Sequence, residues 1–383
     1  MATRVCIVQP LVPRYRGPVF ERLSAVPDLS VEVWADLSGR VGSLEGITAS
    51  DRIKLRHAPY KEHRGIVWQP AMLQAMHEDF DAVMLPWNIR SPHLFIALAK
   101  RRRPPVILWG HGFGTHHERL GGWLRRRAAS MAEACMFYGP SSRDQAAARG
   151  LPPDQLFVAP NAVDQELIQA AAARWADPQR RLQALHALGL QDGPFMLFMS
   201  RLEPEKRPDL AIAALPAIRE RVPNAGLVFV GDGSQRPLLE ARVRELGLGA
   251  HVRFMGAIHD EDRIAPLALS ASLLIHPGAL GLSIFHAFGY GLPVVTTDAM
   301  HLQMPETEAL EPGRNGLTFR QGDLADLARV CSRILLDQGL RSSLSAAAQH
   351  TVLAENGRNI PGMVAGIERA IRFVSQSPHG GHR

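Results

Sequence analysis

The sequence predicts an α/β protein made of two doubly wound domains, and three observations lead to that prediction. Short runs rich in β-branched residues alternate with helical stretches, as in parallel sheets that are covered on both faces. The alternation is interrupted once, and 383 residues are enough for two or three domains. Turns that hold glycine or paired cations follow several runs, as at the ligand-binding edge of such sheets.

A helical segment over residues 164–193, rich in Ala, Arg and Gln, separates two sets of strand candidates. We interpret this segment as a linker between the two doubly wound halves, and the cleft between them as the expected ligand site. The first set is 5–8, 31–35, 82–85, 106–109, 134–138 and 156–159, and the second is 195–199, 227–230, 252–254, 273–275, 294–296 and 317–319.

The composition, 46% apolar and 21% charged, is that of a soluble globular protein. No apolar run reaches the roughly 20 residues that cross a bilayer, and the start lacks a signal-peptide pattern, so we expect a cytoplasmic protein. The three cysteines, Cys6, Cys135 and Cys331, lie far apart and predict neither a disulfide nor a metal site. The net charge of +6 favours anionic partners, among them nucleotides, acidic lipid and nucleic acid.

Lys206 is an unusual residue, because lysine is rare in a chain whose cations are mostly arginine. It lies five residues after Arg201, just beyond the strand candidate 195–199, and Pro208 suits the first position of a following helix. Both cations are thus expected at the carboxyl end of a strand, beside a helix amino terminus. That arrangement suits a diphosphate, although a solvated turn with two exposed cations is the alternative.

Two glycine turns follow strand candidates in the second half. The turn 231–233 is a poor dinucleotide fingerprint, because Arg236 stands at the place of a third glycine, and this argues against a dehydrogenase. The loop 278–283 opens a helix after a buried strand and predicts a second anion cradle.

In this order and spacing, the segments SRLEPEKRPDL, FVGDGSQRPLLE, VRFMGAI and HAFGYGLPVV resemble glycosyltransferase family 4. The segments PVILWGHG and APNAVD extend the resemblance into the first half. It implies the GT-B fold, in which two Rossmann-like domains face each other across a cleft. We expect an acceptor-binding domain over 1–170 and a nucleotide-sugar domain over 190–355, with a last helix at about 360–378 that packs back onto the first. The family moves a sugar from a nucleotide-diphosphate donor with retention of configuration.

The resemblance also implies site residues. Arg201 and Lys206 would bind the donor diphosphate and stabilise the leaving group without a metal, and His111 would touch the donor sugar. Further donor contacts are expected from Gly281, Leu282 and Ser283 at the phosphate, from Arg253, Gly256 and Ile258 at the base, and from Glu308 in a late loop.

Two glutamates separated by seven residues are common in the family, and Gly278 and His286 stand at these positions here. The first glutamate usually lies near the donor sugar and the second near the ribose. His286 can still hydrogen-bond a ribose hydroxyl. Glu306 or Glu308 is a hypothetical source of the missing carboxylate.

Acceptor contacts are predicted at strand ends of the first half, from Arg16, Gly17 and Asn88, with purely structural roles as the alternative. A basic helix with a tryptophan follows in the same half. It could lie on an anionic membrane or could be an ordinary core-facing helix with solvated arginines. Its apolar positions are Leu120, Trp123, Leu124, Ala128 and Met131, beside Arg125, Arg126 and Arg127.

We therefore expect a retaining transferase that moves a hexose-type sugar from a UDP- or GDP-sugar to a glycan or lipid-linked glycan. No cofactor and no nucleic-acid partner are expected, and the protein is placed in the cytoplasm or on the inner face of the membrane. Two alternatives stay open: a sugar-nucleotide epimerase of the same fold, and a non-catalytic protein that binds nucleotide-sugars or glycans.

Overall fold

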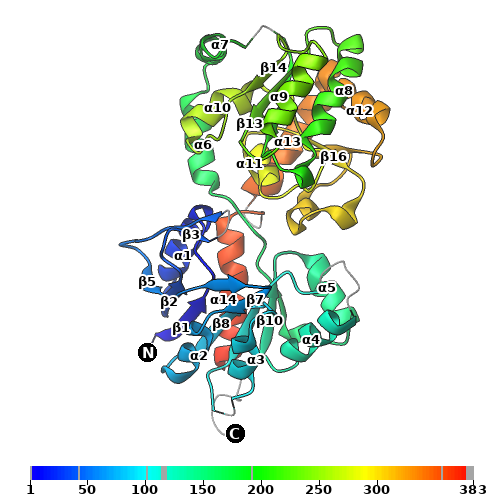
Figure 1. Cartoon of the computed structure of the whole chain (residues 1–383). Coiled ribbons are helices and arrows are strands. Elements are labelled where there is room, and N and C mark those ends of the chain that lie inside the picture. Colours follow the sequence, from blue (N-terminus) through cyan, green and yellow to red (C-terminus); the bar gives the residue numbers. More distant parts are fainter. Residues whose placement is uncertain are drawn as a thin grey trace. The chain divides into compact units, whose positions relative to one another are not determined.

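The structure is a computed structural model that describes residues 2–41, 44–100, 102–113, 119–190, 193–354 and 357–376 (Figure 1). Its contacts divide the chain into two compact units. The first unit consists of two segments, one that ends at Val163 and one that begins at Asn359. The second unit is Asp164–Arg358. Among the described residues, no helix is both long and apolar enough to span a bilayer.

The first unit is built on a parallel sheet of seven strands in the order β11-β10-β9-β8-β1-β2-β5. All six predicted strands are present. The seventh strand, β5, lies at the edge of the sheet and was not predicted. Its sequence KLRH has mostly exposed side chains, so it contains no apolar run that would indicate a strand. The strands are β1 (Thr3–Val8), β2 (Leu29–Ala35), β5 (Lys54–His57), β8 (Ala82–Pro86), β9 (Val106–Gly110), β10 (Ala134–Phe137) and β11 (Leu156–Val158).

The first unit also contains two short pairs of antiparallel strands, which were not predicted. They are β3 (Arg40–Val41) with β4 (Leu44–Glu45), and β6 (Lys61–His63) with β7 (Ile66–Trp68). Arg64 and Gly65 join β6 to β7 with φ angles of 49° and 80°, the left-handed backbone that a two-residue hairpin turn requires.

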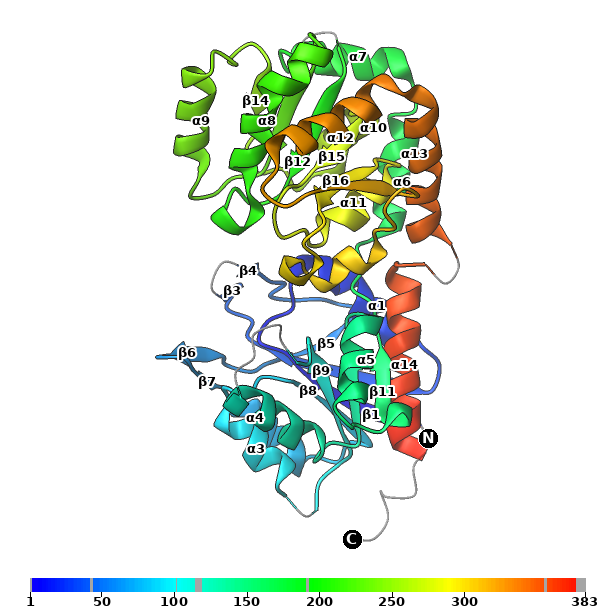
Figure 2. The same ribbon diagram turned by 90° about the vertical axis from the view of Figure 1, so that its right-hand side faces the viewer.

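Helices cover both faces of the first sheet. The last helix, α14, lies alongside α1 and β11 in Figure 2, and Gly366 permits the close approach, because a Cβ there would come within 2.4 Å of the Val158 carbonyl oxygen. The helices of this unit are α1 (Gly17–Ser24), α2 (Ala71–Gln74), α3 (Pro92–Leu98), α4 (Arg119–Ala129), α5 (Pro140–Ala148) and α14 (Ile360–Gln376), with 3-10 turns η1 (Arg14–Arg16), η2 (Ala75–His77) and η3 (Pro153–Gln155).

The second unit contains a six-stranded parallel sheet in the order β14-β13-β12-β15-β16-β17. All six strands were predicted, because each is a short apolar run that is buried on both faces. They are β12 (Phe195–Met199), β13 (Gly226–Val230), β14 (Val252–Phe254), β15 (Leu273–Ile275), β16 (Val294–Thr297) and β17 (Gly316–Phe319). The confirmed fold is thus two Rossmann-like α/β units.

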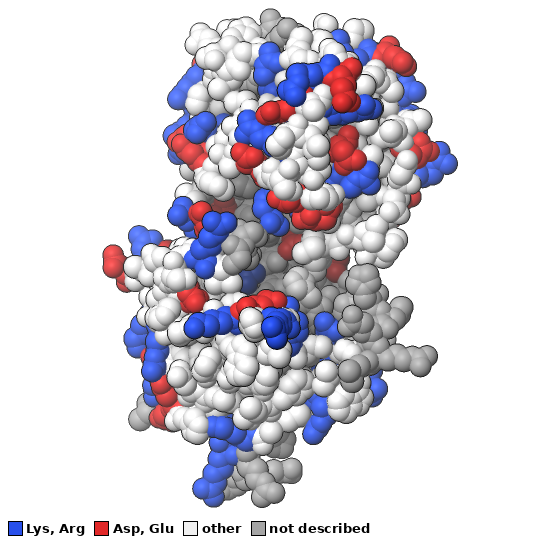
Figure 3. All heavy atoms as spheres, in the orientation of Figure 1, with Lys and Arg blue, Asp and Glu red and all other residues white. Residues whose placement is uncertain are grey.

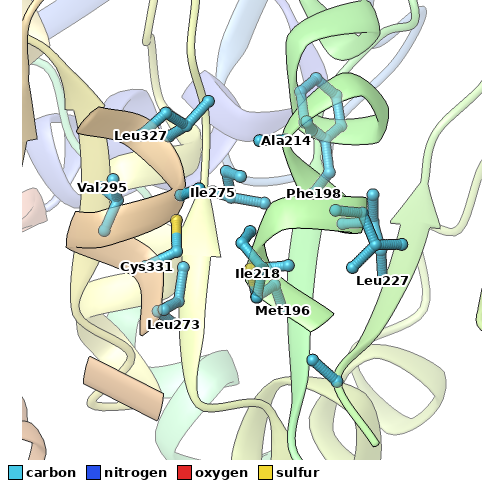
Figure 4. Packing of buried hydrophobic residues seen from close by; sticks show 14 of the residues in the cluster. Met196, Phe198, Ala214, Ile218, Leu227, Leu273, Ile275, Val295, Leu327 and Cys331 are labelled. Atoms are coloured by element: carbon cyan, nitrogen blue, oxygen red, sulfur yellow. The ribbon is translucent and has the colours of Figure 1, made fainter. Parts of the chain in front are cut away.

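One face of the second sheet packs against α8, α9 and α12. Met196 and Phe198 of β12 meet Ile218 and Cys331 from these helices in a buried cluster (Figure 4). The helices of the unit are α6 (Gln165–Arg174), α7 (Pro178–Ala187), α8 (Pro208–Arg221), α9 (Arg236–Glu245), α10 (Glu261–Ser270), α11 (Ser283–Gly289), α12 (Leu324–Leu336) and α13 (Gln338–Leu353), with 3-10 turns η4 (Pro204–Lys206), η5 (Met300–Leu302) and η6 (Pro305–Ala309).

The segment predicted as a linker is instead part of the second unit. Helices α6 and α7 pack against α10, and Gln165 donates a hydrogen bond to the Phe285 carbonyl oxygen at 3.1 Å. The division therefore falls between Val163 and Asp164. A helical stretch without strands looks like a linker in sequence, but its helices pack here against α10 and α11.

Strand order reverses once in each sheet. In the first unit β2 lies on one side of β1 and β8 on the other, and in the second unit β13 and β15 flank β12 in the same way. Open α/β sheets bind ligands beyond the carboxyl ends of the strands at such a reversal. The loops after β1 and β8, and those after β12 and β15, are therefore the places to look for a site.

Candidate functional site

At the reversal point of the second unit, the loops after β12 and β15 are clasped together by three hydrogen bonds. The Gly278 N–H donates to the Lys206 carbonyl oxygen at 3.1 Å, and the Ala279 N–H donates to the Glu205 carbonyl oxygen at 2.8 Å. The Lys206 ammonium donates to the Ala279 carbonyl oxygen at 2.7 Å. The structure thus brings together the predicted cation and the predicted glycine loop.

Two cations lie in this place. Burial lowers the pKa of Lys206, and the nearby Arg201 charge lowers it further, while Glu205 and Glu306 act in the opposite direction. Arg201 lies 3.9 Å from the Glu205 carboxylate, and its side chain is 54% exposed. A half-buried ammonium beside an exposed guanidinium is a favourable site for an anion with two inequivalent charged groups.

Gly278 has no room for a side chain. A Cβ at this position would lie 2.3 Å from the Glu205 carbonyl oxygen and 2.4 Å from the Lys206 carbonyl carbon. The backbone of the lysine loop therefore fills the space that a glutamate would need. At Gly281 nothing lies within 4 Å of a Cβ, so the glycine loop opens three residues later.

His276 lies in the core just before the glycine loop, and the sequence analysis did not single it out. The residue has no exposed surface, and its ring stacks on Phe198 at 5.2 Å with an interplanar angle of 9°. Burial, with the nearby Lys206 charge, lowers the pKa of His276 to about 3. The ring is consequently neutral at physiological pH, and its position after an apolar strand was the signal that could have revealed it.

A polar loop after β16 braces the glycine loop. Gln303 accepts a hydrogen bond from the Leu280 N–H at 2.7 Å and donates one to the Thr296 hydroxyl at 3.1 Å. The Thr307 hydroxyl donates to the Leu280 carbonyl oxygen at 3.2 Å. Neither Gln303 nor Thr307 was among the site residues predicted from the sequence.

The two glutamates of that loop lie in η6 and differ in surroundings. Glu306 is 5% exposed and raises the pKa of Lys206 electrostatically, against the larger effect of burial. Glu308 acts on Arg358, whose pKa burial lowers and both glutamates raise. Of these two glutamates, Glu306 is thus the one that acts on Lys206, in addition to Glu205.

The glycine turn after β13 holds the neighbouring loops together. The Gly231 N–H donates to the Gly256 carbonyl oxygen at 2.8 Å. Gly231 has a φ of 144°, and a Cβ there would lie 1.9 Å from the Ser200 carbonyl oxygen. This turn has a packing role, and it brings Gly256 to the carboxyl edge, with the buried Ile258 two residues beyond.

Arg253 is not brought to this edge. Its guanidinium donates to the carbonyl oxygens of Gly189 at 3.2 Å and Gly249 at 2.7 Å, which precede β12 and β14 at the opposite edge of the sheet. Its side chain therefore lies away from the place predicted for the base. Sequence position on a strand could not show in which direction a long side chain bends.

His286 lies in the first turn of α11 and is paired with a carboxylate that sequence analysis missed. Its Nε2 lies 2.7 Å from a Glu261 carboxylate oxygen, and the Tyr290 hydroxyl donates to the other oxygen at 2.6 Å. Burial raises the pKa of Glu261, but the hydrogen bonds from His286 and Tyr290 outweigh it and leave that pKa below its ordinary value. Helix α11 alone gives no sign of this partner, because Glu261 comes from α10.

The predicted residues of the first unit follow three strand ends. Arg16 is 6% exposed, stacks 5.0 Å from the Trp109 ring and donates to Asn161 at 2.8 Å. The exposed His111 lies 4.8 Å from the Tyr138 ring. Arg16 therefore supports the interior of this edge, whereas His111 is exposed at its surface.

Gly17 and Asn88 lie beside the reversal point of the first sheet. Gly17 begins α1, and a Cβ there would have its nearest neighbour, Ile47, at 4.0 Å. Asn88 follows β8 and accepts a hydrogen bond from the Arg90 N–H at 3.1 Å. Neither contact defines a ligand, so their predicted acceptor role stays a prediction.

Comparison with known proteins agrees with the resemblance seen in the sequence. The family model described as "Glycosyltransferase Family 4" matches residues 28–167, and the one described as "Glycosyl transferases group 1" matches residues 186–351. A GDP-mannose-dependent alpha-(1-6)-phosphatidylinositol monomannoside mannosyltransferase from Mycolicibacterium smegmatis is 29% identical over 67% of this chain and 68% of its own length.

Solved structures share the fold of the whole chain. HepE from Anabaena, solved in complex with UDP, has a TM-score of 0.69 at 18% identity and covers 97% of this chain and 100% of its own. A glycosyltransferase from Rickettsia africae has a TM-score of 0.72 at 14% identity, with 98% of this chain and 100% of its own covered.

The clasp predicts a sharp contrast between two glycines of one loop. Gly278→Ala should lower the free energy of unfolding by about 1–3 kcal/mol, because the added methyl group meets backbone that cannot move without breaking the clasp. Gly281→Ala, in open space, should change it by less than about 0.5 kcal/mol. Denaturant unfolding of both variants measures the difference, and equal effects would contradict the account of the loop.

The buried neutral ring of His276 predicts an acid-labile contribution to stability. Above pH 6.5 the ring is neutral in both states and contributes no pH dependence. Below that pH His276 becomes protonated in the unfolded chain, whereas in the folded chain it stays neutral down to about pH 3. The free energy of unfolding should therefore fall by up to about 1.4 kcal/mol for each pH unit.

Denaturant unfolding at pH 7 and pH 5 measures this slope. His276→Phe, which cannot titrate, should flatten it relative to the wild type, whereas His350→Gln at an exposed position should leave it unchanged. An unaltered slope in His276→Phe would show that the ring does not carry the effect.

Proposed function

Because the chain belongs to glycosyltransferase family 4, we propose that it transfers a hexose-type sugar from a UDP- or GDP-sugar to a glycan or lipid-linked glycan, with retention of configuration. The observation that carries the proposal is the clasp of Lys206 on the glycine loop, with Arg201 beside it, at the reversal point of the second sheet. Two cations at this edge provide a site for the donor diphosphate.

The choice of UDP or GDP as the donor nucleotide is supported by the names of similar proteins. One relative is named as GDP-mannose-dependent, and the similar Anabaena protein was solved with UDP and with UDP-glucose. The site fits either donor, because diphosphate recognition by Arg201 and Lys206 does not depend on the base.

The reaction follows from the charge that develops on the departing diphosphate. The bond between the sugar's anomeric carbon and the phosphate oxygen breaks, and a bond from that carbon to the acceptor oxygen forms on the same face. The acceptor's proton passes to a diphosphate oxygen. Arg201 offers a planar fork, and Lys206 has two N–H groups beyond the one that bonds Ala279.

No cofactor and no metal ion are required by this scheme, because the two cations meet the developing charge. The Gly281, Leu282 and Ser283 N–H groups are proposed to contact the same phosphate, and Gly256 and Ile258 the base. His111 is proposed to contact the donor sugar. Glu306 is the better candidate for a supporting carboxylate than Glu308, since it acts electrostatically on Lys206.

An apolar surface of the first unit supports a lipid-linked acceptor. Trp68 of β7, Ile96 of α3 and Trp123 of α4 are 49%, 52% and 61% exposed, and α3 contacts both β7 and α4. Lys61 pairs with Trp68 in the hairpin register. Figure 3 shows a mostly uncharged area in this part of the first unit, bordered mainly by Lys and Arg atoms and on one side by acidic atoms as well. This composition suits an anionic membrane surface at the inner, cytoplasmic face.

Nucleotide binding tests the site directly. UDP or GDP should raise the melting temperature of the wild type, because a ligand that binds only the folded chain stabilises it. Arg201→Ala and Lys206→Ala should each remove most of that shift and of turnover, whereas Arg242→Ala, an exposed arginine of the same unit, should keep both.

Full activity in either cation variant would overturn the assignment of the site. Nucleotide binding without transfer to any acceptor of a broad panel would favour a binding protein. Turnover of the nucleotide-sugar without acceptor would favour an epimerase.

Vesicle binding tests the proposed membrane surface. Co-sedimentation with liposomes should increase with the fraction of anionic lipid, and Trp123→Ala should lower the bound fraction severalfold by removing an exposed indole. Leu238→Ala, which removes a side chain of the second unit that is 65% exposed, is the control and should bind as the wild type does. If the bound fraction did not depend on the fraction of anionic lipid, the proposed membrane surface would be wrong.

A further inference from the structure

His111 is an exposed side chain on a closely packed backbone. The glycines on either side of it leave no room for side chains. A Cβ at Gly110 would lie 3.1 Å from the Cβ of Trp87, and one at Gly112 would lie 2.7 Å from Cε1 of Phe137. Packing therefore fixes the backbone at this point. An exposed imidazole, in contrast, can adopt several rotamers unless a neighbouring group restrains it.

Tyr138 is such a neighbour. It directly follows β10, and its ring lies 4.8 Å from the imidazole of His111 with 51° between the two planes. Aromatic rings attract each other at this distance in tilted arrangements. The contact joins the ends of β9 and β10, which are paired and parallel in the first sheet. The tyrosine ring thus restrains the direction in which His111 points.

Arg16 and Trp109 hold Tyr138 in its turn. The guanidinium carbon of Arg16 lies over the Tyr138 ring at 5.4 Å from its centre, and over the Trp109 ring at 5.0 Å. The same guanidinium donates to the Tyr138 hydroxyl at 3.5 Å. The Tyr138 and Trp109 rings are 5.9 Å apart and tilted by 45°. The tyrosine ring is therefore restrained by a cation and by a second aromatic ring.

Arg16 itself is anchored inside the first unit. Its Nη2 donates to Oδ1 of Asn161 at 2.8 Å, and both residues are 6% exposed. Hydrogen bonds that involve a charged group are about twice as strong as neutral ones. Arg16 lies in η1, beyond β1, and Asn161 follows β11. The contacts therefore run from Asn161 through Arg16 and Tyr138 to an exposed imidazole, and they connect the ends of four strands.

We propose that Tyr138 is a positioning residue for His111, and that Arg16 acts through Tyr138. Under the proposed function, on which this inference rests, His111 contacts the donor sugar. Tyr138 sets the direction of the imidazole before the sugar binds. This raises turnover, because a displacement of about 1 Å in a reacting site can slow the reaction about a hundredfold. Tyr138 acts through His111 and not by touching the sugar.

A double-mutant cycle separates positioning from a structural role. Tyr138→Leu removes the ring and should lower kcat about tenfold or more. Combined with His111→Ala, the same change should lower kcat by less than about twofold, because positioning matters only while the imidazole is present. The dissociation constant of UDP or GDP should stay within about threefold throughout, since the diphosphate is bound by Arg201 and Lys206.

Two further variants complete the cycle. Tyr138→Phe keeps the ring and loses only a long hydrogen bond, so its kcat should stay within about threefold of the wild type. Tyr60→Leu removes another half-buried tyrosine of the same unit and should leave kcat unchanged. An unaltered kcat in Tyr138→Leu, or a loss of the same size after His111 has been replaced, would overturn the inference.

A measurement on the folded wild type does not depend on turnover. In NMR spectra, the ring current of Tyr138 should displace the imidazole resonances of His111, assigned with His111→Gln, from those of the exposed His350. Tyr138→Phe should preserve the displacement. Coinciding resonances of the two histidines would show that the rings are not in contact, and the inference would be wrong. If the displacement is present but the wild type transfers no sugar, the proposed function fails, and the role of Tyr138 fails with it.

Discussion

The candidate site depends on one contact, the backbone clasp between Glu205–Lys206 and Gly278–Ala279. Two N–H groups of the glycine loop and one ammonium hydrogen connect loops that leave different strands. The clasp places a half-buried cation at the reversal point of the sheet and requires glycine at position 278. Because backbone occupies the space, no larger residue fits there without opening the site.

Buried groups on two sides support the clasp. His276 fills the core before the glycine loop as a neutral ring stacked on Phe198, and Gln303 and Thr307 hold Leu280 from the loop after β16. Neutral partners serve here because a second buried positive charge near Lys206 would be costly. Glu306 adds the opposing negative charge. The long polar loop after β16 is therefore a structural part of the site.

Much of this architecture could be predicted from sequence. All twelve predicted strands exist, because buried parallel strands are short apolar runs bounded by turns, and Pro208 begins its helix as expected. Edge strand β5 was missed because its residues are polar, and α6 and α7 were taken for a linker because helical composition does not say what a helix covers. Their packing on α10 depends on contacts far apart in the chain.

Those parts of the site that are formed by residues close together in the sequence could be predicted. Arg201 and Lys206 are near each other along the chain, whereas Glu261 reaches His286 from a different helix, and no spacing rule links residues 25 positions apart. Arg253 bends toward the other edge of the sheet, and Arg16 turns inward to stack on Trp109. Side-chain direction is decided by tertiary neighbours, which a single sequence does not display.

A crystal structure of the chain with UDP or GDP would show where the diphosphate binds. We expect phosphate oxygens within about 3.2 Å of the Arg201 guanidinium and the Lys206 ammonium, with the clasp between Lys206 and Gly278 intact. A diphosphate bound elsewhere, for example at the opposite edge of the sheet beside Arg253, would contradict this expectation.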